Sequence, residues 1–286
     1  RDKAQRTPHQ GDRFLIDRTK PVRQVQDCPI YAGMMESMDD AVGIVLKALD
    51  DLGLAENTVV IFTSDNGGVS SGDAYATSCL PLRGGKGRQW EGGIKQPYYI
   101  KVPGLTQAKS TSAIPVTGTD FFPTMLELAG LPAMPEQHVD GLSLVPLLKG
   151  NKITDRALFW HYPHYGNQGG EPSAIIRKGD WKLIHYYENE NDELYQLSKD
   201  IGEQNNLTAK EPKITQTLRE ELDAWLKETG ALTPLQDKRY NPVAKKKYRE
   251  TFNKKHKAQL EKTHARYLDS NYVPNKNWWG SKLTQD

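Results

Sequence analysis

The sequence predicts an α/β protein followed by a smaller antiparallel sheet, and three observations support this fold class. Residues 58–63 form a short, continuous run of β-branched and aromatic side chains, typical of a strand buried on both faces of a parallel sheet. An amphipathic helical pattern precedes this run, and the two together make half of an α/β unit. Short strand patterns at closer spacing follow Gly150. We therefore expect an α/β domain over residues 1–150, a small β subdomain with a helix over 151–234, and a basic extension over 235–286.

The α/β part is expected to begin with a surface segment, because residues 1–27 are mostly polar. Apolar residues then recur at steps of three and four from Pro29 until Gly53, which predicts a helix whose methionines fill the core. A second extended run covers residues 97–102. A further helix is expected over residues 119–129, since an acidic residue lies in its first turn and a glycine follows its end.

The smaller sheet is expected to contain four antiparallel strands. Residues 178–180 have the sequence Lys-Gly-Asp, which predicts a hairpin turn between the second and third strands. An amphipathic helix over residues 211–228 is suited to cover one side of this sheet. The expected strands are residues 157–161, 173–177, 181–187 and 193–197.

Composition excludes several classes of protein. The chain has 286 residues, of which 37% are hydrophobic and 26% charged, so it is neither collagen, a coiled coil nor a wholly disordered chain. No apolar run approaches the ~20 residues of a membrane-spanning helix. The two cysteines, Cys28 and Cys79, are too few for a disulfide framework and are expected to be buried thiols.

The net charge of +2 hides an asymmetry along the chain. Residues 235–286 carry a net +8, and residues 1–234 a net −6. A basic tail of this kind suits a sulfated polysaccharide, another anionic polymer or the protein's own acidic part. Its interleaved aromatic residues would also suit nucleic acid, which is not the expected partner. A solvated extension without a ligand is the alternative interpretation.

Candidate metal ligands follow the predicted buried strand. Asp65 and Asn66 begin an Asp-Asn-Gly-Gly segment, and ligands of open α/β sheets bind outside such strand ends. A carboxylate and a carboxamide offer the hard oxygen donors that divalent cations such as calcium prefer. The same four residues also suit an ordinary turn, so both interpretations stay open at this point.

A second candidate is Lys86, which lies between two glycines in the segment of residues 82–93. This segment is richer in glycine than a plain loop requires, because each glycine raises the entropy cost of ordering the chain. A lysine flanked by glycines can reach a phosphate or sulfate without steric crowding. A flexible surface lysine is the alternative, and a P-loop is excluded because the glycine spacing is wrong.

Taken together, these segments resemble the C-terminal half of a type I sulfatase of the alkaline phosphatase superfamily. The resemblance covers residues 29–235 and rests first on the helical segment 31–43, on Thr-Ser-Asp-Asn-Gly-Gly at 63–68 and on Leu-Arg-Gly-Gly-Lys-Gly at 82–87. The other matching segments are residues 91–93, 119–124, 140–144, 179–183 and 193–195. The resemblance implies an alkaline-phosphatase-like mixed sheet between helices and the hydrolysis of sulfate esters.

The resemblance also implies roles for individual residues. Asp65 and Asn66 match residues that help to ligate one calcium ion, and Lys86 matches the lysine that contacts the sulfate. Arg83, in the same motif, is expected to bind substrate as well. His161 and His164 lie in a stretch similar to one in polysaccharide sulfatases, which suits a sugar subsite. A buried structural histidine is the alternative for this stretch.

One part of the family pattern is missing. Sulfatases use a formylglycine nucleophile made within a Cys/Ser-x-Pro/Ala-x-Arg motif. Cys79 to Arg83 fits the bare spacing but lies after Asp65, whereas the family's nucleophile precedes that loop by a long stretch. We therefore expect the nucleophile in an N-terminal half of the same protein, which the resemblance would place in the periplasm or outside the cell. A phosphate or phosphonate monoester hydrolase, and a non-catalytic glycan-binding remnant, are the alternatives.

Overall fold

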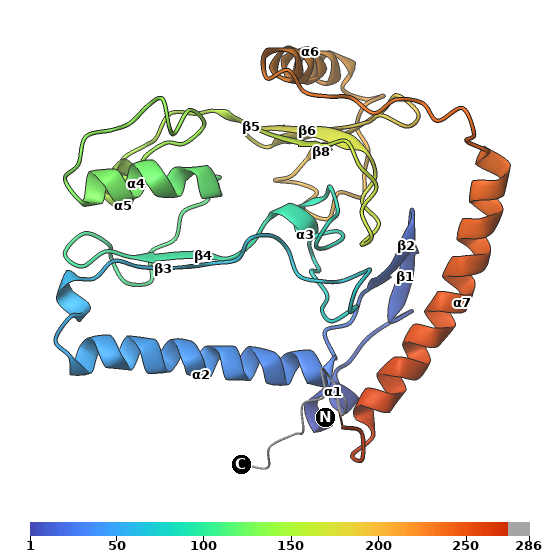
Figure 1. Ribbon diagram of the computed structural model, residues 1–286, viewed down its shortest axis with the longest axis horizontal. Helices are drawn as coiled ribbons and strands as arrows, with labels where there is room; N and C mark the ends of the chain where they lie inside the picture. The colour runs from blue at the N-terminus through green and yellow to red at the C-terminus, as the bar shows by residue number, and fades with distance from the viewer. Residues whose placement is uncertain (274–286) are drawn as a thin grey trace. The chain divides into compact units, whose positions relative to one another are not determined.

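The structure, a computed structural model, describes residues 1–273 and contains two compact units. The first unit consists of Arg1–Asp40, Asn66–Lys95 and the chain from Ala157 onward. The second consists of Ala41–Asp65 and Gln96–Arg156. Figure 1 labels the elements of both units along the chain. The predicted boundaries at residues 150 and 235 stay predictions, and the last part of the predicted basic extension lies outside the described residues.

The four-stranded antiparallel sheet of the first unit confirms the expected pattern. Its strands follow one another in the order β5-β6-β7-β8, and Ile176 of β6 lies opposite Leu183 of β7. Gly179 forms the turn between these strands with a φ of 55°, a conformation that glycine adopts without strain. The strands are β5 (Ala157–Tyr162), β6 (Ser173–Lys178), β7 (Trp181–Tyr186) and β8 (Asn191–Gln196).

Both faces of this sheet are covered. On one face, helix α6 (Pro212–Glu228) places Leu218, Leu222 and Leu226 against a cluster that includes Ile176 (Figure 1). On the other face, a second cluster contains Trp90, which comes from the glycine-rich segment and is fully buried. The sheet is therefore the platform on which the segment carrying Lys86 rests.

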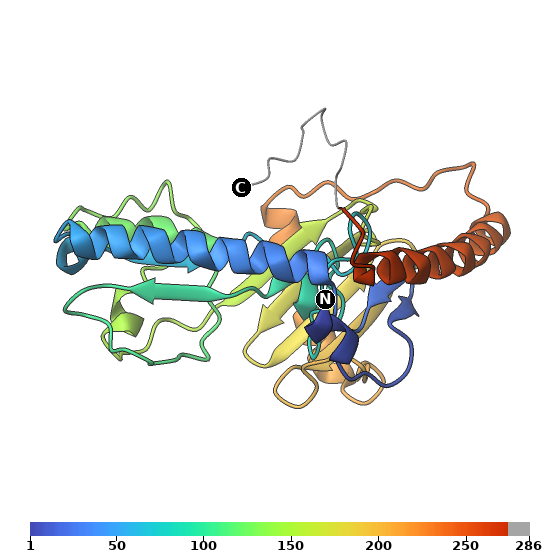
Figure 2. The same cartoon turned by 90° about the horizontal axis from the view of Figure 1, so that it is seen from below.

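The N-terminal segment is not the surface segment that its polarity suggested. After the short helix α1 (Asp2–Arg6), β1 (Phe14–Asp17) pairs with β2 (Lys20–Arg23) as an antiparallel hairpin whose Phe14 and Val22 are buried. The 27-residue helix α7 (Pro242–Leu268) lies alongside this hairpin (Figures 1 and 2). The expectation was wrong because the partner of the hairpin comes from the other end of the chain.

Helix α2 (Pro29–Asp51) confirms the predicted helix, but its apolar face is not in a core. None of its side chains is buried among the described residues, and Met34 is 63% exposed and Ile44 71% exposed. The expected filling of a core by its methionines is therefore wrong for the described part of the chain. Amphipathic spacing predicts a face suited to burial, and it does not say which residues cover that face.

In the second unit, the strand predicted for a parallel sheet proves to be antiparallel. β3 (Val60–Thr63) pairs with β4 (Tyr98–Lys101), and β3 is only half-buried, with Phe62 37% exposed. A continuous apolar run identifies a strand but does not fix the direction of its neighbour. The short helices of this unit are η1 (Ala55–Asn57), η2 (Gly118–Asp120), α4 (Phe121–Leu128) and α5 (Val145–Leu148).

Asp120 organises the second unit. Its side chain is fully buried and accepts hydrogen bonds from the amides of Thr117, at 2.8 Å, and Leu142, at 2.9 Å. Arg156 adds an ion pair to the same carboxylate. These contacts hold the start of α4 and the loop before α5 together, so a charged residue in the predicted helix serves the packing of this unit.

Candidate functional site

Two glycine-rich loops of the first unit interlock through their backbones. The amide of Gly67 donates to the carbonyl of Gly93 at 3.0 Å, and the amide of Lys86 donates to the carbonyl of Gly68 at 2.8 Å. The segment that follows Asn66 and the segment that carries Lys86 are thereby held side by side. This pairing places two motifs that lie 20 residues apart in the sequence in one local structure.

The glycines are required by the closeness of this packing. A Cβ atom added at Gly67 would lie 1.8 Å from the carbonyl oxygen of Gly92, and one added at Gly85 would lie 2.1 Å from Oγ of Ser70. Both distances are far below van der Waals contact, so no side chain fits at either position. The glycine content of the segment therefore reflects the close approach of neighbouring backbone, a reason that the sequence analysis did not predict.

A buried ionic cluster fixes the end of the Lys86 segment to the sheet. Lys182 of β7 is fully buried and lies 2.8 Å from a carboxylate oxygen of Glu203 and 3.1 Å from one of Glu91. Glu91 begins the short helix α3 (Glu91–Ile94), and its amide donates to Glu203 at 2.6 Å. Arg177 also pairs with Glu91 at 3.1 Å. Burial raises the pKa of Glu203 above its ordinary value, although Lys182 acts to lower it.

This cluster was not predicted from the sequence. The signal available in the sequence was a lysine, Lys182, between Trp181 and the apolar residues of a predicted strand. A lysine in such a position needs carboxylate partners when it is buried, because an isolated buried charge is very costly. Its partners come from segments 91 and 21 residues away, and no local pattern identifies them.

Lys86 is half-buried on its loop. Its backbone is fixed by the hydrogen bond to Gly68, while its side chain makes no hydrogen bond or ion pair with any residue of the described range 1–273. An ammonium group that the fold holds in place without a carboxylate partner can bind an anion as a point charge. The side chain of Lys86 therefore suits the predicted binding of an anion, and this role stays a prediction.

Asp65 and Asn66 follow β3 closely, as expected. Asp65 is exposed and Asn66 is half-buried, and the hydroxyl of Ser64 lies 3.4 Å from the carboxylate of Asp65. Within residues 1–273, no group of three or more His, Cys, Asp or Glu side chains is arranged to hold a metal ion. A carboxylate and an amide oxygen are donors that calcium accepts, but they would supply only part of its six to eight oxygen ligands. Calcium binding by Asp65 and Asn66 stays a prediction.

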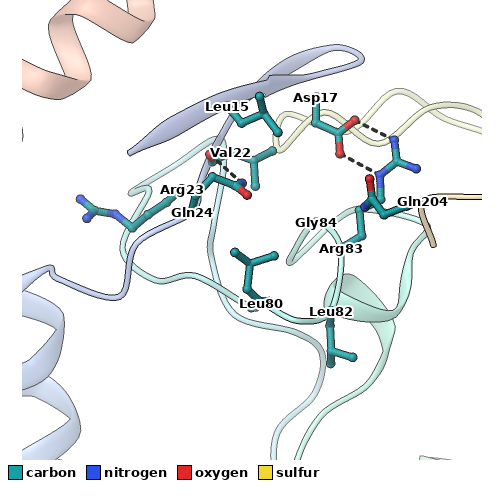
Figure 3. A pocket seen from close by; sticks show the side chains of 11 residues that line it. Leu15, Asp17, Val22, Arg23, Gln24, Leu80, Leu82, Arg83, Gly84 and Gln204 are labelled. Carbon is teal, nitrogen blue, oxygen red and sulfur yellow. Dashed lines mark hydrogen bonds and ion pairs between the residues drawn. The ribbon is translucent and has the colours of Figure 1, made fainter. Parts of the chain in front are cut away.

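Arg83 is engaged within the protein itself. Its guanidinium group makes two hydrogen bonds to the carboxylate of Asp17, at 2.8 and 2.9 Å (Figure 3), and its charged carbon lies 3.8 Å from the centre of the Trp90 ring. Burial would lower the pKa of Arg83, but the hydrogen bonds to Asp17 raise it above its ordinary value. The adjacent cavity of about 90 Å³ is much smaller than a typical ligand site of roughly 300 Å³ or more. These contacts give Arg83 a role in holding the loop.

The two predicted histidines have different surroundings. His161 is half-buried, its Nε2 lies 3.0 Å from the carbonyl of Leu232, and its Nδ1 lies 3.0 Å from the hydroxyl of Tyr187. Both of its nitrogens are therefore engaged, which supports the structural alternative. His164 is exposed and contacts the ring of Tyr162 edge-on, with 5.6 Å between ring centroids. A sugar subsite at His164 stays a prediction.

Cys79 has the properties of an inert thiol. Burial raises its pKa, and its sulfur lies 3.6 Å from the carbonyl of Gly68. A raised pKa disfavours the reactive thiolate. Cys28 is buried, as predicted, and both cysteines are free thiols. Cys79 is only half-buried, although the sequence predicted a buried thiol.

Two family models match the chain. The model described as "N-sulphoglucosamine sulphohydrolase, C-terminal" matches residues 86–229, and the model described as "Sulfatase" matches residues 2–131. A protein of Formosa agariphila named sulfatase is 38% identical over 232 residues, which cover 73% of this chain and 41% of that protein. The chain thus spans about two fifths of the length of this relative.

Solved structures show the same likeness in three dimensions. One was determined in complex with its substrate D-glucosamine-2-N,6-O-disulfate; it has a TM-score of 0.56 at 27% identity and covers 68% of this chain and 39% of its own. The phosphonate monoester hydrolase of Agrobacterium radiobacter has a TM-score of 0.52 at 28% identity and covers 68% of this chain and 40% of its own. The predicted α/β fold class is confirmed.

Proposed function

We propose that this chain, which belongs to the type I sulfatase family and has its alkaline-phosphatase-like fold, forms part of an enzyme that hydrolyses sulfate esters. The observation that carries the proposal is the placement of Lys86. Its loop is locked to the segment after Asn66 by backbone hydrogen bonds, and its side chain makes no ion pair or hydrogen bond in the part of the chain that the structure describes. A fixed and uncommitted cation suits a sulfate group.

In this proposal Lys86 binds a sulfate oxygen and stabilises negative charge that develops on the leaving-group oxygen as the S–O bond breaks. A preorganised charge of this kind acts more strongly in the transition state than in the ground state. Arg83 supports Lys86 indirectly, because its contacts with Asp17 and Trp90 hold the loop.

Asp65 and Asn66 would supply two oxygen ligands for a calcium ion. When bound, the ion would polarise the sulfate ester as a Lewis acid. The two side chains would orient the cation, and the remaining ligands would come from other parts of the protein. Of the predicted sugar-binding residues, we retain His164, whose exposed ring suits contact with a carbohydrate.

We propose further that the chain works together with an N-terminal half of the same protein that supplies a formylglycine nucleophile. The substrate would be a sulfated carbohydrate, which is supported by the sulfated glucosamine bound to the similar solved structure. The family resemblance favours a periplasmic or secreted enzyme. Among residues 1–273, no helix has both the length and the apolar content needed to cross a bilayer.

A phosphonate monoester hydrolase is the second candidate, because a solved enzyme of that activity is similar to this chain. Sulfate esters and phosphonate monoesters both have a tetrahedral centre that carries negatively charged oxygens, so Lys86, Asp65 and Asn66 suit both. The two candidates differ in which ester the intact protein hydrolyses faster. Comparing kcat/KM for an aryl sulfate and an aryl phosphonate decides between them.

The test of the proposal uses the intact protein that contains this chain. We expect Lys86→Ala to lower kcat/KM for an aryl sulfate by about 10²–10³-fold, as for the loss of one preorganised donor to a developing oxyanion. Lys95→Ala is the matched control, because Lys95 is an exposed lysine nine residues further on. Chelation of calcium should abolish the activity of the wild-type protein, and mass spectrometry should detect formylglycine.

Two results would contradict the proposal. The first is a Lys86→Ala variant that retains activity within about threefold of the wild type while Lys95→Ala behaves in the same way. The second is an intact protein that carries formylglycine and calcium and hydrolyses no sulfate ester. Unchanged circular dichroism of Lys86→Ala would establish that the loss of activity is local.

A further inference from the structure

Helix α7 carries a row of exposed lysines. We call Lys247, Lys254, Lys255 and Lys262 the lysine stripe; they occur at spacings of seven, one and seven residues, which places them on one side of an α-helix. All four are exposed, and none makes a hydrogen bond or an ion pair with another residue of the described range. At 1.5 Å per residue the stripe extends over about 22 Å.

The opposite side of α7 is fixed to the rest of the first unit. The side-chain amide of Asn253 donates to the carbonyl of Thr19 at 3.0 Å, and His264 is buried at 3% exposure on the same side. At the edge of the stripe, Glu261, which follows Lys254 by seven residues, pairs with Arg13 at 2.9 Å. Figures 1 and 2 both show α7 beside the β1–β2 hairpin. The helix is therefore held in one orientation, with the lysine stripe facing away from the hairpin.

Within the described residues, no carboxylate of α7 forms an ion pair with a lysine of the stripe. The helix contains two acidic residues, Glu250 and Glu261. Glu261 is bound to Arg13, and Glu250 lines a cavity of about 460 Å³ together with Arg18 and Asn253. Four like charges along one helix face repel one another, and an anionic chain laid along the face would relieve this repulsion.

The stripe belongs to a part of the chain that the family models do not match. Those models end at residues 131 and 229, and α7 begins at Pro242. Between the lysines, the same face carries the small side chains Thr251 and Ala258. The stripe thus lies on a basic face bordered by the exposed rings of Tyr248 and Phe252, and its charge suits a linear polyanion better than an apolar protein partner.

We propose that the lysine stripe binds a sulfated polysaccharide chain by electrostatic attraction. The choice of a sulfated polysaccharide over other linear polyanions rests on the proposed function. Tyr248 and Phe252, stacked with 5.9 Å between their ring centroids, lie on the same helix and offer an apolar surface for a sugar ring. The stripe would hold a polymeric substrate on the protein and would be of no use to a small sulfate ester.

The experiment measures the affinity of the full protein for fluorescein-labelled heparin at several salt concentrations. The test variant changes all four lysines of the stripe to glutamine, which keeps high helix propensity. The control variant removes the same charge from four other exposed lysines of the first unit. The control substitutions are Lys199→Gln, Lys210→Gln, Lys213→Gln and Lys227→Gln.

For a polyanion with the charge density of duplex DNA, four lysine contacts predict that wild-type affinity falls about 100-fold as salt rises from about 50 to 200 mM. The control variant should keep this dependence, and the stripe variant should lose most of it and bind at least about tenfold more weakly at the lower salt concentration. Chemically desulfated heparin should bind none of the three proteins tightly. KM for a polymeric substrate should rise in the stripe variant, while KM for an aryl sulfate stays constant.

Several results would overturn this inference. They are a stripe variant that binds heparin like the wild type, a control variant that loses as much affinity, tight binding of desulfated heparin, and tighter binding of a 20-base-pair DNA duplex than of heparin of equal charge. The inference and the proposed function fail separately. A protein that binds heparin through the stripe but hydrolyses no sulfate ester contradicts only the proposed function. An active sulfatase whose heparin binding ignores the stripe contradicts only the inference.

Discussion

Replacing Lys182 by methionine tests whether the buried ionic cluster holds the Lys86 segment on the sheet. Lys182 is fully buried between the carboxylates of Glu91 and Glu203, and those side chains are 2% and 0% exposed. Lys182→Met keeps the volume and length of the side chain and removes its charge. Removing one partner of a buried ion pair costs about 3–5 kcal/mol, because the remaining charge has neither water nor a counterion.

The structure places the expected loss toward the lower end of that range. Glu91 keeps Arg177 at 3.1 Å, and Glu203 keeps the amide of Glu91 at 2.6 Å, so neither carboxylate is left without a partner. We expect the free energy of unfolding to fall by about 3 kcal/mol. With an m value of about 2 kcal/mol per molar, the urea midpoint should fall by about 1.5 M. Lys178→Met is the control, because Lys178 pairs with Glu221 but is 54% exposed, and should cost at most about 1 kcal/mol.

The loss should also depend on pH. The pKa of Glu203 in the folded protein is raised by burial, so its ionised form costs stability at pH values above that pKa. This cost declines as the pH falls below that pKa and is gone at the ordinary pKa of 4.5. Removing Lys182 raises the pKa of Glu203 further. The difference between variant and wild type should therefore shrink on acidification, and adding Glu203→Gln should recover part of it at neutral pH. A Lys182→Met protein within about 1 kcal/mol of the wild type, with no change on acidification, would refute the reasoning.

Two further predictions concern the interlocked loops and the docking of α7. Gly67→Ala should lower the free energy of unfolding, measured by thermal denaturation, by about 3 kcal/mol, because the added Cβ would lie 1.8 Å from the carbonyl oxygen of Gly92. The control is Gly33→Ala on α2, whose added Cβ meets no atom within 4 Å, so this variant should be neutral or stabilising. Burial would raise the pKa of Glu188, but hydrogen bonds from Lys245 and two tyrosines lower it to about 2, so its ionised form contributes stability that is lost as pH falls from about 4.5 to about 2. Limited proteolysis of α7 should increase over that range in the wild type and should increase less in Glu188→Gln, because other carboxylates that hold α7, such as Glu261, are still present; equal pH profiles would count against this role.

The elements with strong local patterns could be predicted from the sequence. The four strands of the antiparallel sheet, α6 and α2 lie within a few residues of their expected bounds, because alternation, helical period and the turn at Gly179 are all local signals. The sulfatase resemblance, which rests on ordered short motifs, is confirmed by the two family models. The main secondary-structure elements and the protein family could thus be predicted from the sequence alone.

Long-range pairing could not be predicted. The hairpin of β1 and β2 gains its partner from α7, and Asn253 binds Thr19 across 234 residues of sequence. The antiparallel direction of β3 depends on β4, which follows after the whole glycine-rich segment. In the site, Lys86 could be singled out from the sequence because the glycine-rich segment around it is a local pattern. The roles of Lys182 and Glu203 could not, because they depend on contacts that only the fold creates. The roles assigned to Asp65, Asn66 and Lys86 stay predictions.

The discontinuous make-up of the first unit has a consequence for synthesis on the ribosome. Trp90 and Glu91 need the sheet beneath them, and Glu203, whose carboxylate holds the amide of Glu91, is translated 112 residues later. At roughly 5–20 residues per second, this delay is about 6–22 s. During that interval the strands that bury Trp90 in the folded protein are still incomplete, so its side chain lacks the surface against which it packs. The segment that carries the lysine on which the proposed chemistry depends therefore cannot be completed before Glu203 has been made.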